Sequence, residues 1–141
     1  MASQRKPIRH AVTAILKAAT IAEVNSNNIF SNRIEAYEKQ ELPAISIFTE
    51  EEDPVPYSTE NKKYRRALTL RIETCVHAKS DLDDKLDDIS DAIEELLLER
   101  QDLNGTAQGL TLLSTSMELS GESAESSIGV CIQVFEINYT K

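Results

Sequence analysis

The sequence has little of what catalysis, cofactor binding or membrane insertion requires. Its 141 residues include no tryptophan, four glycines, two histidines and two cysteines. The few glycines form none of the glycine-rich phosphate-binding motifs, and no apolar run approaches the roughly 18 residues that cross a bilayer. The basic N-terminal residues 1–7 are followed by no apolar run, so no secretion signal is expected. Two cysteines fit a reducing compartment better than a secreted disulfide framework.

What is present is enough for one domain. Apolar residues make up 40% of the chain and aromatic residues only 5%, so we expect an aliphatic core. The length fits a single domain over residues 1–141. The net charge of −9 opposes nucleic-acid binding, because that affinity comes mainly from Lys and Arg side chains that neutralise phosphates.

Apolar spacing predicts an α+β domain with a four-stranded, mainly antiparallel sheet and two helices on one of its faces. Spacings of three and four residues predict helices, and strict alternation predicts strands. The helices are expected over 7–19 and 80–100, and the strands over 43–49, 64–77, 109–119 and 128–139. The order αββαββ is a circular permutation of the ferredoxin-like order, and placing both helices on one face buries both apolar stripes. The opposite face would remain partly exposed.

Three connections separate these elements. Residues 20–41 are polar and rich in asparagine, and Ile29 and Phe30 are expected to pin them to the core. Residues 50–63 hold two prolines and many charges, which predicts an extended charged loop. Residues 120–127 form a connection rich in Ser and Glu.

The last predicted strand changes its apolar face halfway along. Val130, Ile132 and Val134 share one side, and Phe135, Ile137 and Tyr139 then take the opposite one. The change indicates either a β-bulge or a strand whose second half meets a different surface. A partner subunit could provide that surface.

Side chains suited to calcium binding or nucleophilic catalysis do not form a recognisable site. Residues 81–86 begin like a calcium-binding loop, but Lys85 and Leu86 stand where an oxygen ligand and a glycine are needed. The apolar stripe also requires a helix there, so these carboxylates are interpreted as a solvated helical face. A nucleophile needs an adjacent base, and neither His10 nor His77 lies in a catalytic motif. We expect no catalytic residues, no cofactor and no metal.

A zinc site was the remaining possibility. Glu73, Cys75 and His77 share one face of a predicted strand, and Cys131 on a neighbouring strand could approach them. No C-x-x-C or H-x₃₋₅-H pair anchors such a site. The alternative is a buried cysteine and a histidine at the rim of the sheet, because cysteine commonly behaves as a small apolar residue.

Charge is segregated between residues 50 and 66. An acidic run is followed by a basic cluster, which predicts either a solvated loop and strand edge or a dipolar patch. In the second case the acidic loop of one copy would meet the basic segment of the next. The candidate subunit-interface residues are Glu50, Glu51, Glu52, Asp53, Lys62, Lys63, Arg65 and Arg66.

The order of features also carries a resemblance. After the first helix and an irregular segment with Ile29–Phe30, residues 41–48 read Glu-Leu-Pro-Ala-Ile-Ser-Ile-Phe and lead into an acidic loop. A basic strand over 66–73, a helix start at 81–83 and a closing strand over 129–139 follow. In this order the chain resembles the tail terminator proteins (minor tail protein U) of lambda-like long-tailed phages. The segment near 120–127 has no counterpart in that pattern.

The resemblance implies a structural virion protein without catalysis or cofactor. Such proteins form a six-membered ring on a completed tail tube, stop further addition of tube subunits and dock to the head connector. The implied partners are further copies of this chain, a tail tube protein and a head connector protein. The implied location is the virion tail, preceded by the host cytoplasm. DNA would only pass through the ring, and acidic side chains facing the channel would disfavour phosphate binding.

Three other interpretations stay open. The first is another phage neck or tail-completion protein of the same architecture. The second is a ferredoxin-like regulatory or ligand-binding domain, which a deep apolar pocket would favour. The third is a small enzyme, against which stands the lack of any site that combines a nucleophile, a base and an orienting group.

Overall fold

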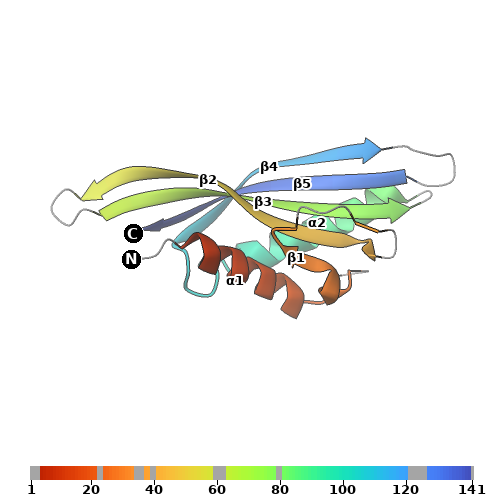
Figure 1. Ribbon diagram of the computed structural model, residues 1–141, viewed down its shortest axis with the longest axis horizontal. Helices are drawn as coiled ribbons and strands as arrows, with labels where there is room; N and C mark the ends of the chain where they lie inside the picture. Colours follow the sequence, from red (N-terminus) through yellow and green to blue (C-terminus); the bar gives the residue numbers. More distant parts are fainter. Residues whose placement is uncertain are drawn as a thin grey trace.

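The chain forms a five-stranded sheet with two helices on one face (Figure 1). The computed structural model describes residues 4–21, 24–33, 37–38, 41–58, 63–78, 81–120 and 127–140. In chain order the elements are α1 (Arg5–Ala18), a 3₁₀ turn (Ser26–Asn28), β1 (Ile29–Ser31), β2 (Ala44–Ser58), β3 (Lys63–Ala78), α2 (Leu82–Glu99), β4 (Gly109–Ser120) and β5 (Ser127–Thr140). The sheet order is β1-β2-β3-β5-β4.

The α+β class and both helices were predicted correctly, but the strand count was wrong. The fifth strand, β1, lies within the predicted connection 20–41 and runs parallel to β2, with Ile29 opposite Ile45. A strand of three residues is too short to show alternation, so it could not be predicted from the sequence. The sequence indicated only that Ile29 contacts the core, and Ile29 is buried. The four long strands pair antiparallel throughout, in the order β2-β3-β5-β4.

The predicted loop over residues 50–63 is largely a β-hairpin. Strand β2 continues to Ser58 and β3 begins at Lys63, with register shifts between Thr49 and Glu52 and near the end of β2. Strand β1 covers only residues 45–47 of β2, so the outer edge of β2 beyond them needs no backbone donor and tolerates proline. The hairpin extends past the helix layer (Figure 1).

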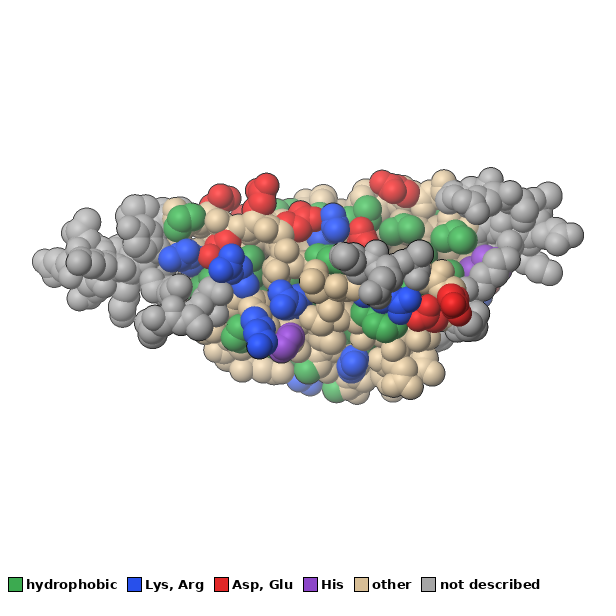
Figure 2. All heavy atoms as spheres, in the orientation of Figure 1, with side chains coloured by type: hydrophobic (Ala, Val, Ile, Leu, Met, Phe, Trp, Pro, Cys, Tyr) green, Lys and Arg blue, Asp and Glu red, His purple; other side chains and the backbone are tan. Residues whose placement is uncertain are grey.

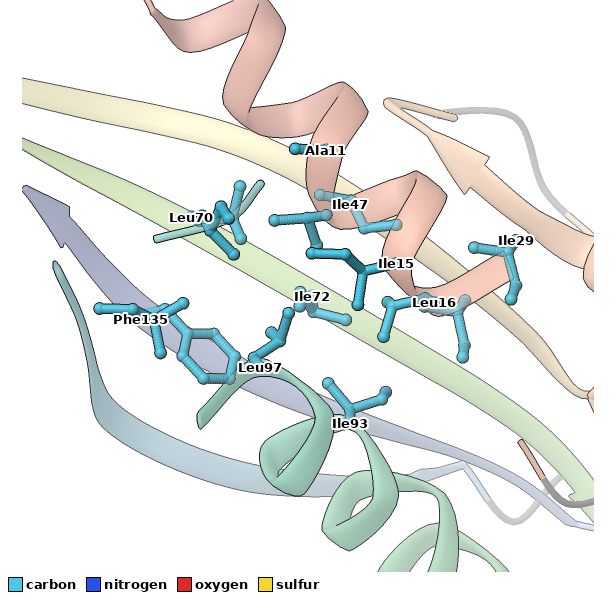
Figure 3. Packing of buried hydrophobic residues seen from close by; sticks show 14 of the residues in the cluster. Ala11, Ile15, Leu16, Ile29, Ile47, Leu70, Ile72, Ile93, Leu97 and Phe135 are labelled. Atoms are coloured by element: carbon cyan, nitrogen blue, oxygen red, sulfur yellow. The ribbon is translucent and has the colours of Figure 1, made fainter. Parts of the chain in front are cut away.

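An aliphatic core lies between the helices and the sheet. Figure 3 shows Ile15 and Leu16 of α1 directed at Ile47 and Ile72, while α2 brings further side chains toward Phe135. Spacings of three and four residues along both helices place these side chains on one face, as the sequence predicted. The core therefore holds both helices on the same side of the sheet.

Gly129 of β5 sets how closely α2 can approach the sheet. A Cβ atom at this position would lie 2.8 Å from Leu86 Cδ1 and 3.1 Å from two atoms of Leu82. We expect Gly129→Ala to lower the free energy of unfolding by about 1–2 kcal/mol, because the well-packed leucines must shift. Urea denaturation measures this. Gly109→Ala is the matched control, since nothing lies within 4 Å of its Cβ, and an equal loss there would contradict the explanation.

Candidate subunit and partner interfaces

The acidic and basic candidate segments lie side by side on the paired strands of one hairpin. Arg66 Nη1 lies 3.1 Å from Glu52 Oε2, and Arg71 Nη1 lies 2.6 Å from Glu50 Oε1. These carboxylates are therefore neutralised partly by cations of their own chain. The sequence could not reveal this pairing, because it depends on the register of β2 against β3.

The eight candidate interface residues separate into three groups. Glu50, Glu51, Asp53 and Arg65 are exposed, whereas Glu52 and Arg66 are half-buried at the hairpin base. Lys63 starts β3 opposite Ser58, and its side chain, like all of Lys62, lies outside the described residues. The exposed group is the part of the prediction that a neighbouring molecule could contact.

Tyr139 joins the hairpin base to β5. Its hydroxyl donates a hydrogen bond to Glu52, whose other oxygen accepts from Arg66. Burial, reinforced by the Glu52 carboxylate, raises the pKa of Tyr139 to about 12. Tyr139 is 2% exposed, so this contact is internal and ties the base of the hairpin to β5. Sequence reasoning placed Tyr139 in the last strand but gave no signal for its partner.

A second network covers β2 on the sheet face away from the helices. The Arg33 guanidinium lies 4.6 Å from the Phe30 ring centroid and 4.7 Å from that of Tyr37. It also donates to both oxygens of Glu41, at 2.5 and 3.0 Å. Hydrogen bonds from Arg33 and then from the Glu38 backbone lower the pKa of Glu41. With the Arg33 amide bonded to Ser46, this network shields one end of the open face.

The rest of the open face carries an aliphatic row on β5. Val130, Ile132 and Val134 are half-buried there, whereas Cys131 and Phe135 point into the core. The β3–β5 register is unbroken over the full strand, so β5 has no bulge; the bulge lies in β4, between Leu112 and Ser114. The apolar pattern changes sides along β5 because this strand carries apolar residues on both faces of the sheet, and not because the strand is bulged. Figure 2 shows hydrophobic side chains gathered over β4 and β5.

No metal or nucleophilic site emerges from the residues predicted to approach one another. Cys131 lies in the core, on the opposite sheet face from Glu73, Cys75 and His77, which rules out the zinc set. Within the described residues, no group of three or more His, Cys, Asp or Glu side chains could hold a metal ion. Burial raises the pKa of both cysteine thiols, which disfavours the reactive thiolate.

The most exposed apolar surface lies along β4 and the adjoining flank of α2. Leu113, Met117 and Leu119 of β4 are 54%, 41% and 61% exposed, and Leu98 of α2 is 41% exposed. Over the described residues β4 pairs only with β5, so its outer edge offers backbone donors and acceptors. Exposed strand edges with apolar side chains are typical docking surfaces. Sequence alternation located β4 but could not show that it is an edge strand.

These features define an α+β domain whose notable surfaces suit contacts with other proteins. Among the described residues, no helix is both long and apolar enough to cross a membrane. Residues 3–139 match the family described as phage minor tail protein U, and the chain belongs to that family. It is accordingly a structural component of a phage tail.

A solved structure shares the fold. A chain described as "Virion of native gene transfer agent (GTA) particle" aligns with a TM-score of 0.55 and 12% identity, covering 93% of this chain and 94% of that chain. At this identity the likeness concerns the fold alone. No curated protein matches the chain.

Proposed function

We propose that this protein caps the completed tail tube as a ring, stops tube polymerisation and offers the surface to which the head connector docks. Membership of the minor tail protein U family supports this role. The observation that carries the proposal is the apolar edge strand β4, whose exposed Leu113 and Leu119 would be buried by contact with a protein partner. A ring requires two different complementary patches on each copy, and a sheet with two distinct edges can supply them.

The projecting hairpin provides a further part of the proposed ring contact. Glu51, Asp53 and Arg65 are exposed on its two strands, and a neighbouring copy or the tube could meet them. Glu52 and Arg66 are left out of this set, because Glu52 already pairs with Arg66 and accepts the hydrogen bond from Tyr139 at the hairpin base. Charge reversal of the exposed three tests the contact without breaking that base.

The acidic surplus fits passage of DNA through the proposed ring. Residues 81–102 contain 10 Asp and Glu against two Lys and Arg, a net −8 of the total −9. The outermost of these, such as Asp84, Asp88 and Glu95, are exposed. A channel lined by them would repel phosphate and let DNA move freely. A lumen lined mainly by Lys and Arg would contradict this part.

Deleting the protein should produce tails of uncontrolled length that fail to join heads. Without a cap, tube subunits continue to add to the growing end. Electron microscopy of tails assembled with and without the protein measures the length distribution. Supplying the wild-type chain in trans is the control and should restore uniform, head-joined tails. Uniform tail length in its absence would overturn the proposal.

A further inference from the structure

The two lateral edges of the domain differ in chemistry. One edge consists of β4 and the adjoining flank of α2, and we call it the α2 edge. The other consists of β1, the end of β2 near it, and α1, and we call it the α1 edge. The order β1-β2-β3-β5-β4 puts them at opposite sides of the sheet. Among the described residues, the four exposed large apolar side chains, Leu98, Leu113, Met117 and Leu119, belong to β4 or α2.

Acidic side chains line the α2 edge beside these apolar groups. Asp83, Asp87 and Asp91 are exposed and spaced by four residues, so they form one stripe along the helix. Gln133 of β5 donates a hydrogen bond to the Ser90 carbonyl, which lies between Asp87 and Asp91 along α2, so this stripe is on the side of the helix that meets β5. The opposite flank of α2, with Leu96, packs against the core beside α1.

Basic side chains line the α1 edge. Residues 5–17 contain four Lys and Arg and no Asp or Glu. Arg9 donates to Ser31 of β1 and to Thr49 of β2, so its flank of α1 faces the β1 side of the sheet. Lys6 and Lys17 are exposed on the adjoining outer surface of the helix. Figure 2 shows blue side chains gathered over α1.

We propose that the α2 edge of one copy docks on the α1 edge of the next copy. This inference rests on the proposed ring and names its contact. The apolar side chains of β4 and Leu98 would supply the burial, and the Asp stripe facing Lys6 and Lys17 would fix the orientation. Two α2 edges would instead bring like charges together, so the contact is head-to-tail. Such a heterologous contact repeats from copy to copy, which is the kind of contact that the proposed ring requires.

A charge swap between the edges tests the contact. One variant carries Asp87→Lys and Asp91→Lys on the α2 edge, and the other carries Lys6→Glu and Lys17→Glu on the α1 edge. We expect each alone to reduce the fraction of normal-length tails at least tenfold, because every seam then opposes like charges. Mixed in equal amounts, the two variants can alternate around an even-numbered ring with every seam matched. Capping should then return toward the wild-type level.

A charge change elsewhere on α2 is the control for this test. Asp88→Lys with Glu95→Lys makes the same charge change on the outer surface of α2, where both side chains are exposed. These side chains belong to the proposed channel lining and not to the contact between copies, so this control is read by tail length alone, which should stay normal. The inference is overturned if the single-edge variants cap normally, or if neither the mixture nor a chain carrying all four changes recovers capping. Recovery in the mixture also shows that the variants fold. Normal tail length in the deletion strain would reject the capping role instead, so the two failures are distinguishable.

Discussion

Replacing Leu97 with alanine is expected to lower the free energy of unfolding by about 2–5 kcal/mol. Leu97 is 0% exposed, and Figure 3 shows it between α2 and the sheet, beside Phe135. Its truncation removes apolar contacts and leaves a cavity. The close-packed helices and strands around it can relax only partly, so the cavity stays largely unfilled. Urea denaturation followed by circular dichroism measures the change.

The neighbouring residue supplies the control for this prediction. Leu98 is the same amino acid one position further along α2, but it is 41% exposed on the α2 edge. We expect Leu98→Ala to change the free energy of unfolding by less than about 0.5 kcal/mol. The proposed ring contact predicts that Leu98→Ala weakens capping nonetheless. Equal destabilisation by both substitutions would contradict the assigned packing of α2.

The regular elements could be predicted because their burial is periodic along the chain. The stripe of α2 predicted a helix over 80–100, and the observed helix is Leu82–Glu99. Alternation predicted a strand over 64–77, and the observed β3 is Lys63–Ala78. In α2, and in β3 from Leu68 to Val76, one face meets the core, so local sequence alone carries the pattern.

The missed elements depend on contacts distant in sequence. Strand β1 forms by pairing with β2, with Ile29 opposite Ile45. A segment of three residues carries no local pattern from which this pairing could be predicted. The prolines of residues 54–56 indicated a loop, yet they lie in β2 beyond residues 45–47, the segment to which β1 pairs. Edge position is a property of the assembled sheet, and it decides whether proline is tolerated.

The candidate interface shows the same limit. Segregated charges around 50–53 and 62–66 were visible in the sequence, but their partners were not. Register decides that Glu52 pairs with Arg66 in the same chain, which removes both from the surface available to a neighbour. The aliphatic side of β5 was the more informative signal, since apolar residues on both faces of a strand indicate two different environments.

Replacing Tyr139 with phenylalanine should lower stability at neutral pH and also remove a loss of stability at high pH. The hydrogen bond from its hydroxyl to the Glu52 carboxylate involves a charged acceptor, so its loss should cost about 1.5–3 kcal/mol. Burial and Glu52 raise the pKa of Tyr139 to about 12 in the folded chain, against about 10 when unfolded. The unfolded chain therefore releases this proton first as pH rises.

The sign of the pH effect follows from that order of proton release. The stabilisation from Tyr139 is complete below about pH 10, falls as pH rises further and is lost near pH 12. The difference in unfolding free energy between the wild-type chain and Tyr139→Phe should thus shrink over this range in urea denaturation. Tyr37→Phe is a comparison variant: burial also raises the pKa of Tyr37, so a pH trend of the same sign is expected there, but without a Glu52 contact. If the difference in unfolding free energy between the two chains stays constant up to pH 12, the pKa of Tyr139 is not raised by folding and the explanation is wrong.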